Sequence, residues 1–227
     1  MTPELLEAIR FYAGDFSRET CGVLVASKPN KAEFVSCNNL SKVDDKCEFC
    51  AKDMARAEDR GKLIGYVHTH SGHVIPSPAD KDFCRISKKP WWIVSQDDWA
   101  RLDTALPFTG RTFAWGVQDC FTLMEDWYSI IGVKFPNILR ESSLMKSGVD
   151  SYMKYLPYTD FELVNEEPKF GDAILLAIQS IDGQPNHAAV HVGEGNILHH
   201  LPNRLSMVEL YDGDYRAATK FVARRKK

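Results

Sequence analysis

Three histidines and an aspartate crowd one short stretch of the chain, HTHSGHVIPSPAD at residues 68–80. His68 and His70 stand two positions apart, so on a strand both imidazoles point to the same face and can reach a single ion. Asp80, ten residues after His70, can supply a third ligand and leave a fourth position for water. This is the layout of a catalytic zinc site, in which Glu19 offers the base that takes a proton from the water.

A second interpretation of the same stretch is purely structural. Ser77, Pro78 and Asp80 occupy the N-cap, first and third positions of a predicted helix, a variant of the capping box. Capping and the helix dipole already explain Asp80, and a single HxH pair is common without a metal. The residues alone therefore leave a metal site and a helix start open. His73, inside the loop, is expected to be exposed, with a role as fourth ligand as the alternative.

Cys120 stands at the start of a predicted helix, where the helix dipole favours the thiolate, the nucleophilic form of cysteine. A thiol peptidase also needs a nearby imidazole and a third polar group that orients it. His187 and His199 supply both from predicted strands, and His191 and His200 compete with them for these roles. A buried cysteine and scattered histidines are, however, also typical of a structural core.

Short helices and strands must position these residues. In the first half, helices are predicted over residues 3–13 and 53–60 and from Pro78 onward. Strands are predicted over the runs CGVLVA, AEFVSC, KLIGYVHT and PWWIVS. The third of these strands ends at the two histidines, and the helix that follows carries Asp80.

A polar segment that contains Pro and Gly, DTALPFTGR, predicts a boundary between two domains, one at 1–105 and one at 108–227. Beyond the boundary, the pattern of QDCFTLMEDWYSIIG predicts a helix. Five successive strands are predicted after it, over the runs AILLAI, HAAVHVG, NILHH, MVELY and KFVARR.

Composition argues against several classes of protein. The net charge of −3 disfavours a nucleic-acid-binding protein, which would carry a basic patch, and the apolar runs are too short to span a membrane. The stretch MTPELLEAIRFYAGDF lacks the regions of a signal peptide, so the chain is expected to stay in a cytoplasm unless another carrier exports it. Its six cysteines, Cys47 and Cys50 included, are therefore expected to be reduced thiols.

The stretch ETCGVLV, followed later by HTH, S and D, resembles the JAMM (MPN-type) metalloprotease motif over most of the first domain. The resemblance implies a mixed α/β domain that binds Zn²⁺. It assigns roles to five residues: the zinc ligands are His68, His70 and Asp80, the base is Glu19, and the residue that orients the water or the oxyanion is Ser77. Ser71 stands where the family usually has proline, and six residues rather than seven separate the HTH run from the serine.

The segments WGVQDCFTL, FGDAILL and HAAVHVGEGNILH resemble, in this order, the NlpC-type cysteine peptidases. The resemblance implies a papain-like α+β domain in which Cys120 is the nucleophile, His187 the base and His199 the orienting residue. The step of twelve residues between the two histidines matches the family pattern and favours them over His191 and His200.

A JAMM domain followed by an NlpC-type domain in one short chain resembles the tail tip assembly proteins of lambda-like bacteriophages. This resemblance implies a peptidase that cuts peptidoglycan stem peptides, typically between D-γ-glutamate and diaminopimelate, and that works with other tail tip proteins. It also implies assembly in the host cytoplasm, a place in the virion tail tip and action at the bacterial cell wall. Two alternatives stay open: a structural assembly factor with vestigial sites, and an isopeptidase acting on ubiquitin-like tails through the first domain alone.

Overall fold

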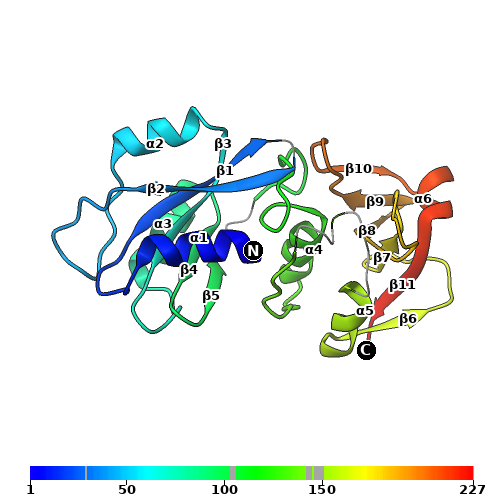
Figure 1. Ribbon diagram of the computed structural model, residues 1–227. Helices are drawn as coiled ribbons and strands as arrows, with labels where there is room; N and C mark the ends of the chain where they lie inside the picture. The colour runs from blue at the N-terminus through cyan, green and yellow to red at the C-terminus, as the bar shows by residue number, and fades with distance from the viewer. Residues whose placement is uncertain (29, 103–105, 142–144, 146–150, 227) are drawn as a thin grey trace. The chain divides into compact units, whose positions relative to one another are not determined.

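In a computed structural model, the chain forms two compact units, Met1–Leu106 and Pro107–Lys227 (Figure 1). The structure describes residues 1–28, 30–102, 106–141, 145 and 151–226. No helix within these ranges is long and apolar enough to span a membrane. Each unit has its own sheet and its own helices.

The first unit is built on a five-stranded mixed sheet in the order β2-β1-β3-β4-β5. Its strands are β1 (Cys21–Lys28), β2 (Lys31–Cys37), β3 (Lys62–Thr69), β4 (Trp91–Val94) and β5 (Trp99–Leu102). β3 and β4 run parallel, and the other neighbouring strands run antiparallel. The four predicted strands are confirmed. β5 escapes prediction because its four residues are all half-buried and show no apolar alternation.

The helices of this unit are α1 (Pro3–Ala13), α2 (Ala51–Glu58) and α3 (Pro78–Ser87), each starting within two residues of its predicted place. Figure 1 shows α1 crossing the front of the sheet, with α3 behind it. Gly65 of β3 has to be a glycine, because a Cβ atom there would lie 2.2 Å from the ring of Trp92. This close approach seats β3, which carries the two histidines, against β4.

The second unit contains a six-stranded antiparallel sheet in the order β10-β9-β8-β7-β11-β6. Its strands are β6 (Phe161–Val164), β7 (Ala173–Leu176), β8 (His187–Gly193), β9 (Asn196–His199), β10 (Met207–Leu210) and β11 (Thr219–Arg225). Helix α4 (Cys120–Ser129) contacts β8 and β9. Its buried Phe121 and Met124 belong to the same hydrophobic cluster as Ala188 and Val190 of β8.

The predicted helix and the five predicted strands of this unit are confirmed. Four elements escape prediction, namely β6, α5 (Ser151–Tyr155), the 3₁₀ turn η2 (Leu156–Tyr158) and α6 (Gly213–Ala218). They are short, and only one residue of β6 is buried, so no periodic pattern marks them. The predicted fold class, a mixed α/β first domain and an α+β second domain, is confirmed.

His200 belongs to the interior of the second unit. Its ring is fully buried and lies 5.1 Å from the ring of Phe113. Burial lowers the pKa of His200 to about 4. The folded protein therefore keeps this ring neutral under conditions in which the unfolded chain, with an ordinary pKa of about 6.5, takes up a proton.

We expect the His200→Leu variant to lose less stability than the wild type as the pH falls from about 7 to about 5. The unfolded state binds the additional proton, so each such histidine lowers the free energy of unfolding by up to about 1.4 kcal/mol per pH unit in this window. Urea denaturation of the full chain at both pH values measures the difference. His73→Gln, at an exposed loop position, is the control and should keep the wild-type dependence. An unchanged pH dependence in His200→Leu would contradict the assignment.

Candidate active sites

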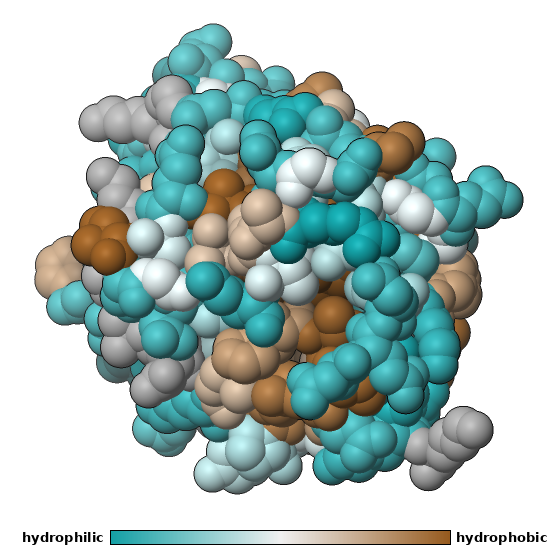
Figure 2. Space-filling view, turned by 90° about the vertical axis from the view of Figure 1, so that its right-hand side faces the viewer, coloured by the Kyte–Doolittle hydropathy of each residue, from teal (hydrophilic) through white to brown (hydrophobic). Residues whose placement is uncertain are grey.

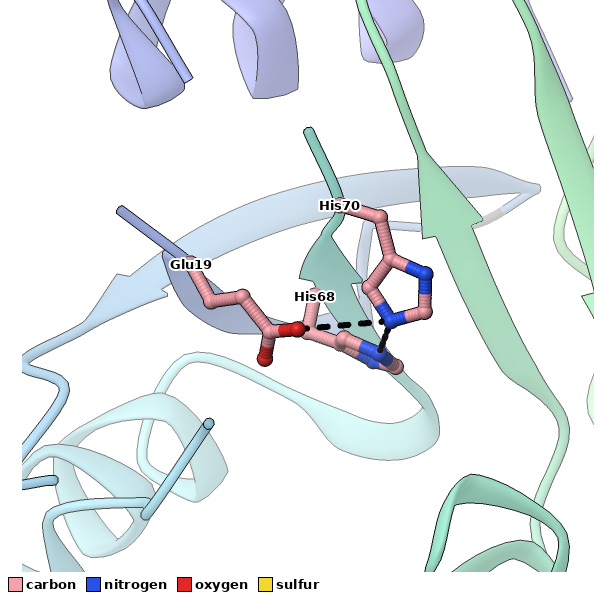
Figure 3. A group of neighbouring side chains, drawn as sticks. All are labelled: Glu19, His68 and His70. Carbon is pink, nitrogen blue, oxygen red and sulfur yellow. Dashed lines mark hydrogen bonds and ion pairs between the residues drawn. The ribbon is translucent and has the colours of Figure 1, made fainter. Parts of the chain in front are cut away.

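Strand β3 ends at two imidazoles that share one face of the sheet. The Nε2 atoms of His68 and His70 lie 2.9 Å apart, and both side chains are buried (Figure 3). Thr69 points to the opposite face, where its Oγ1 accepts the amide hydrogen of Thr20 at 2.9 Å. The alternation of the strand therefore pairs the histidines as the sequence predicts.

Asp80 reaches the same point from the first turn of α3. Its Oδ1 lies 3.2 Å from His68 Nε2, and its Oδ2 lies 3.5 Å from His70 Nε2. The amide of Ser77 donates to Asp80 Oδ2 at 2.7 Å, and the amide of Asp80 donates to Ser77 Oγ at 3.2 Å. This confirms the predicted capping box. The carboxylate of Asp80 thus closes the helix cap and approaches the two imidazoles at the same time.

Glu19 joins the cluster from the segment before β1. Its Oε1 lies 3.4 Å from His70 Nε2, and one ligand atom each from Glu19, His68 and His70 lie within 4.8 Å of one another (Figure 3). Its main chain is anchored on both sides, because the amide donates to Asp44 O at 2.8 Å and the carbonyl accepts from Asn39 Nδ2 at 2.8 Å. Burial raises the pKa of Glu19 to about 7, although the charge of His68 opposes this rise.

Burial and hydrogen bonds set the charges of the other members. Burial lowers the pKa of His70 to about 4, and the neighbouring His68 adds to this shift. Burial alone would raise the pKa of Asp80, but the hydrogen bond and charge of His68 and the contacts with Ser77 outweigh it and lower the pKa to about 2. A neutral imidazole and an ionised carboxylate are the forms that bind metal ions.

The donor set fits zinc. Two imidazole nitrogens that bind one ion at about 2.0–2.1 Å in tetrahedral geometry lie about 3.3 Å apart, close to the 2.9 Å between the Nε2 atoms of His68 and His70. Both Nδ1 atoms are buried without a hydrogen-bond partner among the described residues. A hydrogen on Nδ1 leaves the Nε2 lone pair free to face an ion. His73 is exposed, as expected, and its Nδ1 accepts the amide hydrogen of Ile75 at 3.3 Å.

Helix α4 begins at Cys120 because Asp119 caps it. Asp119 Oδ1 accepts the amide hydrogens of Phe121 and Thr122, each at 3.1 Å. The thiol therefore lies at a helix N-terminus, as the sequence predicts. It is buried, and its Sγ lies 3.5 Å from Tyr152 Oη.

The capping carboxylate is itself fully buried and paired with a cation. Arg140 Nη1 lies 2.7 Å from each oxygen of Asp119. Burial would raise the pKa of Asp119, but the charge and hydrogen bonds of Arg140 lower it below the ordinary value. Burial raises the pKa of the Cys120 thiol, and the charge of Asp119 adds to the rise. Hydrogen bonds with Tyr152 and the Ala188 backbone oppose it, but the thiol stays protonated at neutral pH.

A line of hydrogen bonds crosses three adjacent strands. His187 Nε2 at the start of β8 lies 3.2 Å from His199 Nδ1 at the end of β9. His199 Nε2 lies 2.6 Å from Glu209 Oε2 on β10. Glu209 also accepts hydrogen bonds from Tyr215 Oη at 2.7 Å and from Arg204 Nη2 at 2.9 Å. The two predicted histidines are thus brought together, and a carboxylate extends their line.

The nucleophile and the predicted base lie on elements that touch. Helix α4 contacts β8, and the backbone of Ala188, next to His187, hydrogen-bonds the Cys120 thiol. No hydrogen bond joins Cys120 to His187 among the described residues. Burial lowers the pKa of His187 well below its ordinary value, and the nearby His199 adds to this shift. The resting site therefore holds a neutral thiol and a neutral imidazole.

The two competing histidines make no hydrogen bond to His187 or His199 among the described residues, although the charge of His200 adds to the lowering of the His187 pKa. The ring of His191 lies 6.3 Å from that of Tyr211, and the ring of His200 lies against Phe113. His191 Nδ1 is buried without a hydrogen-bond partner among the described residues. Neither His191 nor His200 is therefore part of the line of hydrogen bonds that runs from His187 through His199.

A pocket opens beside the thiol. Its lining residues come from α4, the segments before and after it, α5 and the residue before β8: Trp115, Phe121, Ile138, Arg140, Tyr152, Tyr155 and Asn186. Tyr152 also contacts Cys120, so the pocket adjoins the predicted nucleophile. Figure 2 shows one face of the molecule, on which hydrophobic side chains gather around a hollow in a largely hydrophilic surface.

Sequence reasoning misses Tyr152, Arg140 and Glu209. No local pattern marks Tyr152 or Arg140, although an acidic residue directly before a buried helix start indicates a need for a cation nearby. Glu209 has a clearer signal. Met207 pairs with His199 across β9 and β10, so alternation places Glu209 two residues along on the same face, within diagonal reach of the imidazole.

Comparisons with known proteins match the two halves of the chain to two families. Residues 110–225 match the NlpC/P60 family, and residues 3–105 match the prokaryotic homologs of the JAB domain. The tail tip assembly protein K of Escherichia phage lambda is 33% identical over 178 residues, which cover 77% of this chain and 88% of that protein. Its namesake from Escherichia phage N15 is 28% identical over 239 residues, which cover 100% of this chain and 96% of that protein.

A solved NlpC/P60 family protein from Bacillus cereus ATCC 10987 is 16% identical, with 95% of this chain and 66% of that chain covered. Its TM-score of 0.41 is too low to support an argument about the fold. The family match spans about half of the chain, and the match to the lambda protein spans most of both proteins. The chain therefore belongs to the NlpC/P60 family, with a match to the prokaryotic homologs of the JAB domain in front of it, and it is similar over most of its length to the phage tail tip assembly K proteins.

Proposed function

We propose that the chain is a tail tip assembly protein whose second domain, residues 108–227, is a thiol peptidase acting on peptidoglycan. The observation that carries the proposal is the line from His187 through His199 to Glu209, because the two histidines lie on β8 and β9, which pack against the helix starting at Cys120. A nucleophile at a helix N-terminus, a buried imidazole and an orienting group are the parts that acyl transfer through a thiol requires.

In the proposed reaction, His187 takes the proton of the Cys120 thiol as the sulfur attacks the carbonyl carbon of the scissile amide. The tetrahedral intermediate collapses to a thioester, and the amine leaves with the proton that His187 returns. Water, deprotonated by the same imidazole, then hydrolyses the thioester and regenerates the thiol. His199 holds the His187 ring in place. The raised pKa of Cys120 and the lowered pKa of His187 mean that proton transfer accompanies attack rather than precedes it.

The proposed substrate is the stem peptide of peptidoglycan, cut between D-γ-glutamate and diaminopimelate. Family membership supports this choice, and the pocket beside Cys120 supports it by combining aromatic side chains with two polar ones, Arg140 and Asn186. We further propose that other tail tip proteins are the partners. The chain would then assemble with them in the host cytoplasm, stay in the virion tail tip and act at the cell wall.

For the first domain, residues 1–105, we propose a zinc peptidase site. His68, His70 and Asp80 would hold the ion, and a bound zinc would supply a water of lowered pKa. Glu19, with a carboxyl pKa of about 7 and an oxygen 3.4 Å from His70, is placed to hold a proton there. Ser77 Oγ accepts an amide in the cap, so its own hydrogen can still be donated to an oxyanion or a water.

A second candidate is a structural assembly factor that does not need catalysis. Two observations favour it: the matched phage proteins are named for tail tip assembly, and no hydrogen bond joins Cys120 to His187 among the described residues. Phage assembled with the Cys120→Ala variant separate the two candidates. We expect normal tails but poor infection, as for a wall-degrading enzyme, whereas normal tails with normal infection would support an assembly role that needs no catalysis.

We expect the wild-type protein to release muropeptides from sacculi that contain diaminopimelate, and Cys120→Ala to release none, because no thioester can form. His187→Ala should reduce the rate by roughly 10²–10⁴, the usual contribution of a positioned base. Mass spectrometry of the soluble products gives both the rate and the bond cleaved. Cys50→Ala, which removes a half-buried thiol of the first unit, is the control. Equal release by wild type and Cys120→Ala would overturn the proposal.

We expect the full chain loaded with zinc to retain about one ion, and Asp80→Asn to retain much less. Asparagine keeps an oxygen that can accept the Ser77 amide, so the cap survives while the negative ligand is lost. His68→Ala should also lose the ion, and His73→Ala should keep it because His73 is exposed and its Nδ1 accepts the Ile75 amide. Elemental analysis after dialysis is the measurement. A wild type without zinc, or an Asp80→Asn variant that binds it equally well, would refute the zinc site.

A further inference from the structure

We propose that Glu209 is a positioning residue that fixes which nitrogen of His187 accepts the proton of Cys120. The inference rests on the proposed thiol peptidase function and adds a residue that neither the motif nor the family match assigns. Glu209 reaches the two imidazoles from β10, where Met207 pairs with His199 and alternation returns the glutamate to the same face. Its Oε2 lies 2.6 Å from His199 Nε2, on the side of the ring away from His187.

Glu209 is held as an anion in one orientation. Tyr215 Oη donates to its Oε2 at 2.7 Å, and Arg204 Nη2 donates to its Oε1 at 2.9 Å. Burial would raise its pKa, but the hydrogen bonds from Tyr215, Arg204 and His199 outweigh burial and lower it to about 2. An ionised carboxylate has no hydrogen to donate. The contact with His199 Nε2 must therefore be a hydrogen bond in which the ring donates.

This one bond sets the tautomers of both rings. Burial lowers the pKa values of His187 and His199, so both rings are neutral and each carries a single hydrogen. With its hydrogen on Nε2, His199 presents a lone pair at Nδ1 to the Nε2 of His187, 3.2 Å away. His187 must then carry its hydrogen on Nε2. Its Nδ1 keeps a lone pair, and that is the atom that accepts the thiol proton.

Without the carboxylate of Glu209, the direction of the hydrogen bond between His187 and His199 is not fixed. A neutral His199 with its hydrogen on Nδ1 would donate to His187 Nε2 and drive the hydrogen of His187 onto Nδ1. The base atom would then already be occupied. Glutamine at position 209 can either accept from or donate to His199 Nε2, so it keeps the shape of the contact and loses the choice of direction.

The test is ¹⁵N NMR of the full chain labelled at histidine, at neutral pH. In the wild type we expect His187 and His199 both to carry their hydrogen on Nε2. In Glu209→Gln, a substantial fraction of both rings should carry it on Nδ1, and Glu209→Asp should restore most of the wild-type signal. Glu162→Gln, at an exposed position on β6 at the opposite edge of the sheet, is the matched control and should leave both signals unchanged. Tyr215→Phe, which removes one bond to Glu209 but none to His199, should give an intermediate shift.

Activity gives a separate readout. We expect Glu209→Gln to lower kcat/KM on stem peptides by roughly 10- to 100-fold, less than the loss of the base itself. A wild type with the hydrogen on Nδ1 of His199, or with a doubly protonated His199, would overturn the inference even if Glu209→Gln fails to fold. An unchanged tautomer in a folded Glu209→Gln would also overturn it. A wild type with the expected tautomers but no peptidase activity would instead refute the proposed function and leave the tautomer assignment standing.

Discussion

The geometry of both sites depends on a carboxylate at the N-terminal end of a helix. The first amides of a helix have no partners within it, so a side chain must satisfy them, and losing such a cap costs about 1 kcal/mol. Asp80 closes the capping box with Ser77 at the start of α3, and Asp119 accepts two amides at the start of α4. Each carboxylate is held in place by its hydrogen bonds to the backbone. Its position is therefore fixed relative to the imidazole pair in the first site and to the thiol in the second.

Strand alternation positions the histidines of each site. In the first unit one strand presents two rings on one face, and in the second unit neighbouring strands present His187 and His199 to each other. Burial lowers the pKa values of His70, His187 and His199, because removing an imidazole from water disfavours its charged form. A neutral ring has a lone pair to offer, which the proposed functions use for an ion in the first unit and for a proton in the second. In both proposals, secondary structure and burial set these properties before any substrate arrives.

The parts of both sites that sequence could predict are those encoded locally. The spacing of His68 and His70, the cap at Ser77 and the position of Cys120 at a helix start each depend on a few adjacent residues, and the structure contains them. Residues such as Tyr152 approach the thiol from a distant segment, and no period or cap marks them. The short edge strands β5 and β6 could not be predicted for a related reason, because their burial comes from tertiary neighbours. The register between β9 and β10, a non-local property, decides that a glutamate meets an imidazole.

The capping carboxylate has opposite consequences in the two units. The charge of Asp80 faces His68 and His70 and is available to a cation. The charge of Asp119 lies next to a thiol whose ionisation it opposes. Arg140 reduces this conflict, because its Nη1 contacts both carboxylate oxygens while its guanidinium lies 4.7 Å from the centre of the Phe121 ring. With the pair close to neutral, the helix dipole still favours charge on the sulfur during attack. The start of α4 has the carboxylate of Asp119 as its cap, and the proposed reaction places a negative charge on the sulfur of Cys120 beside it. A buried cation, Arg140, is therefore needed as well.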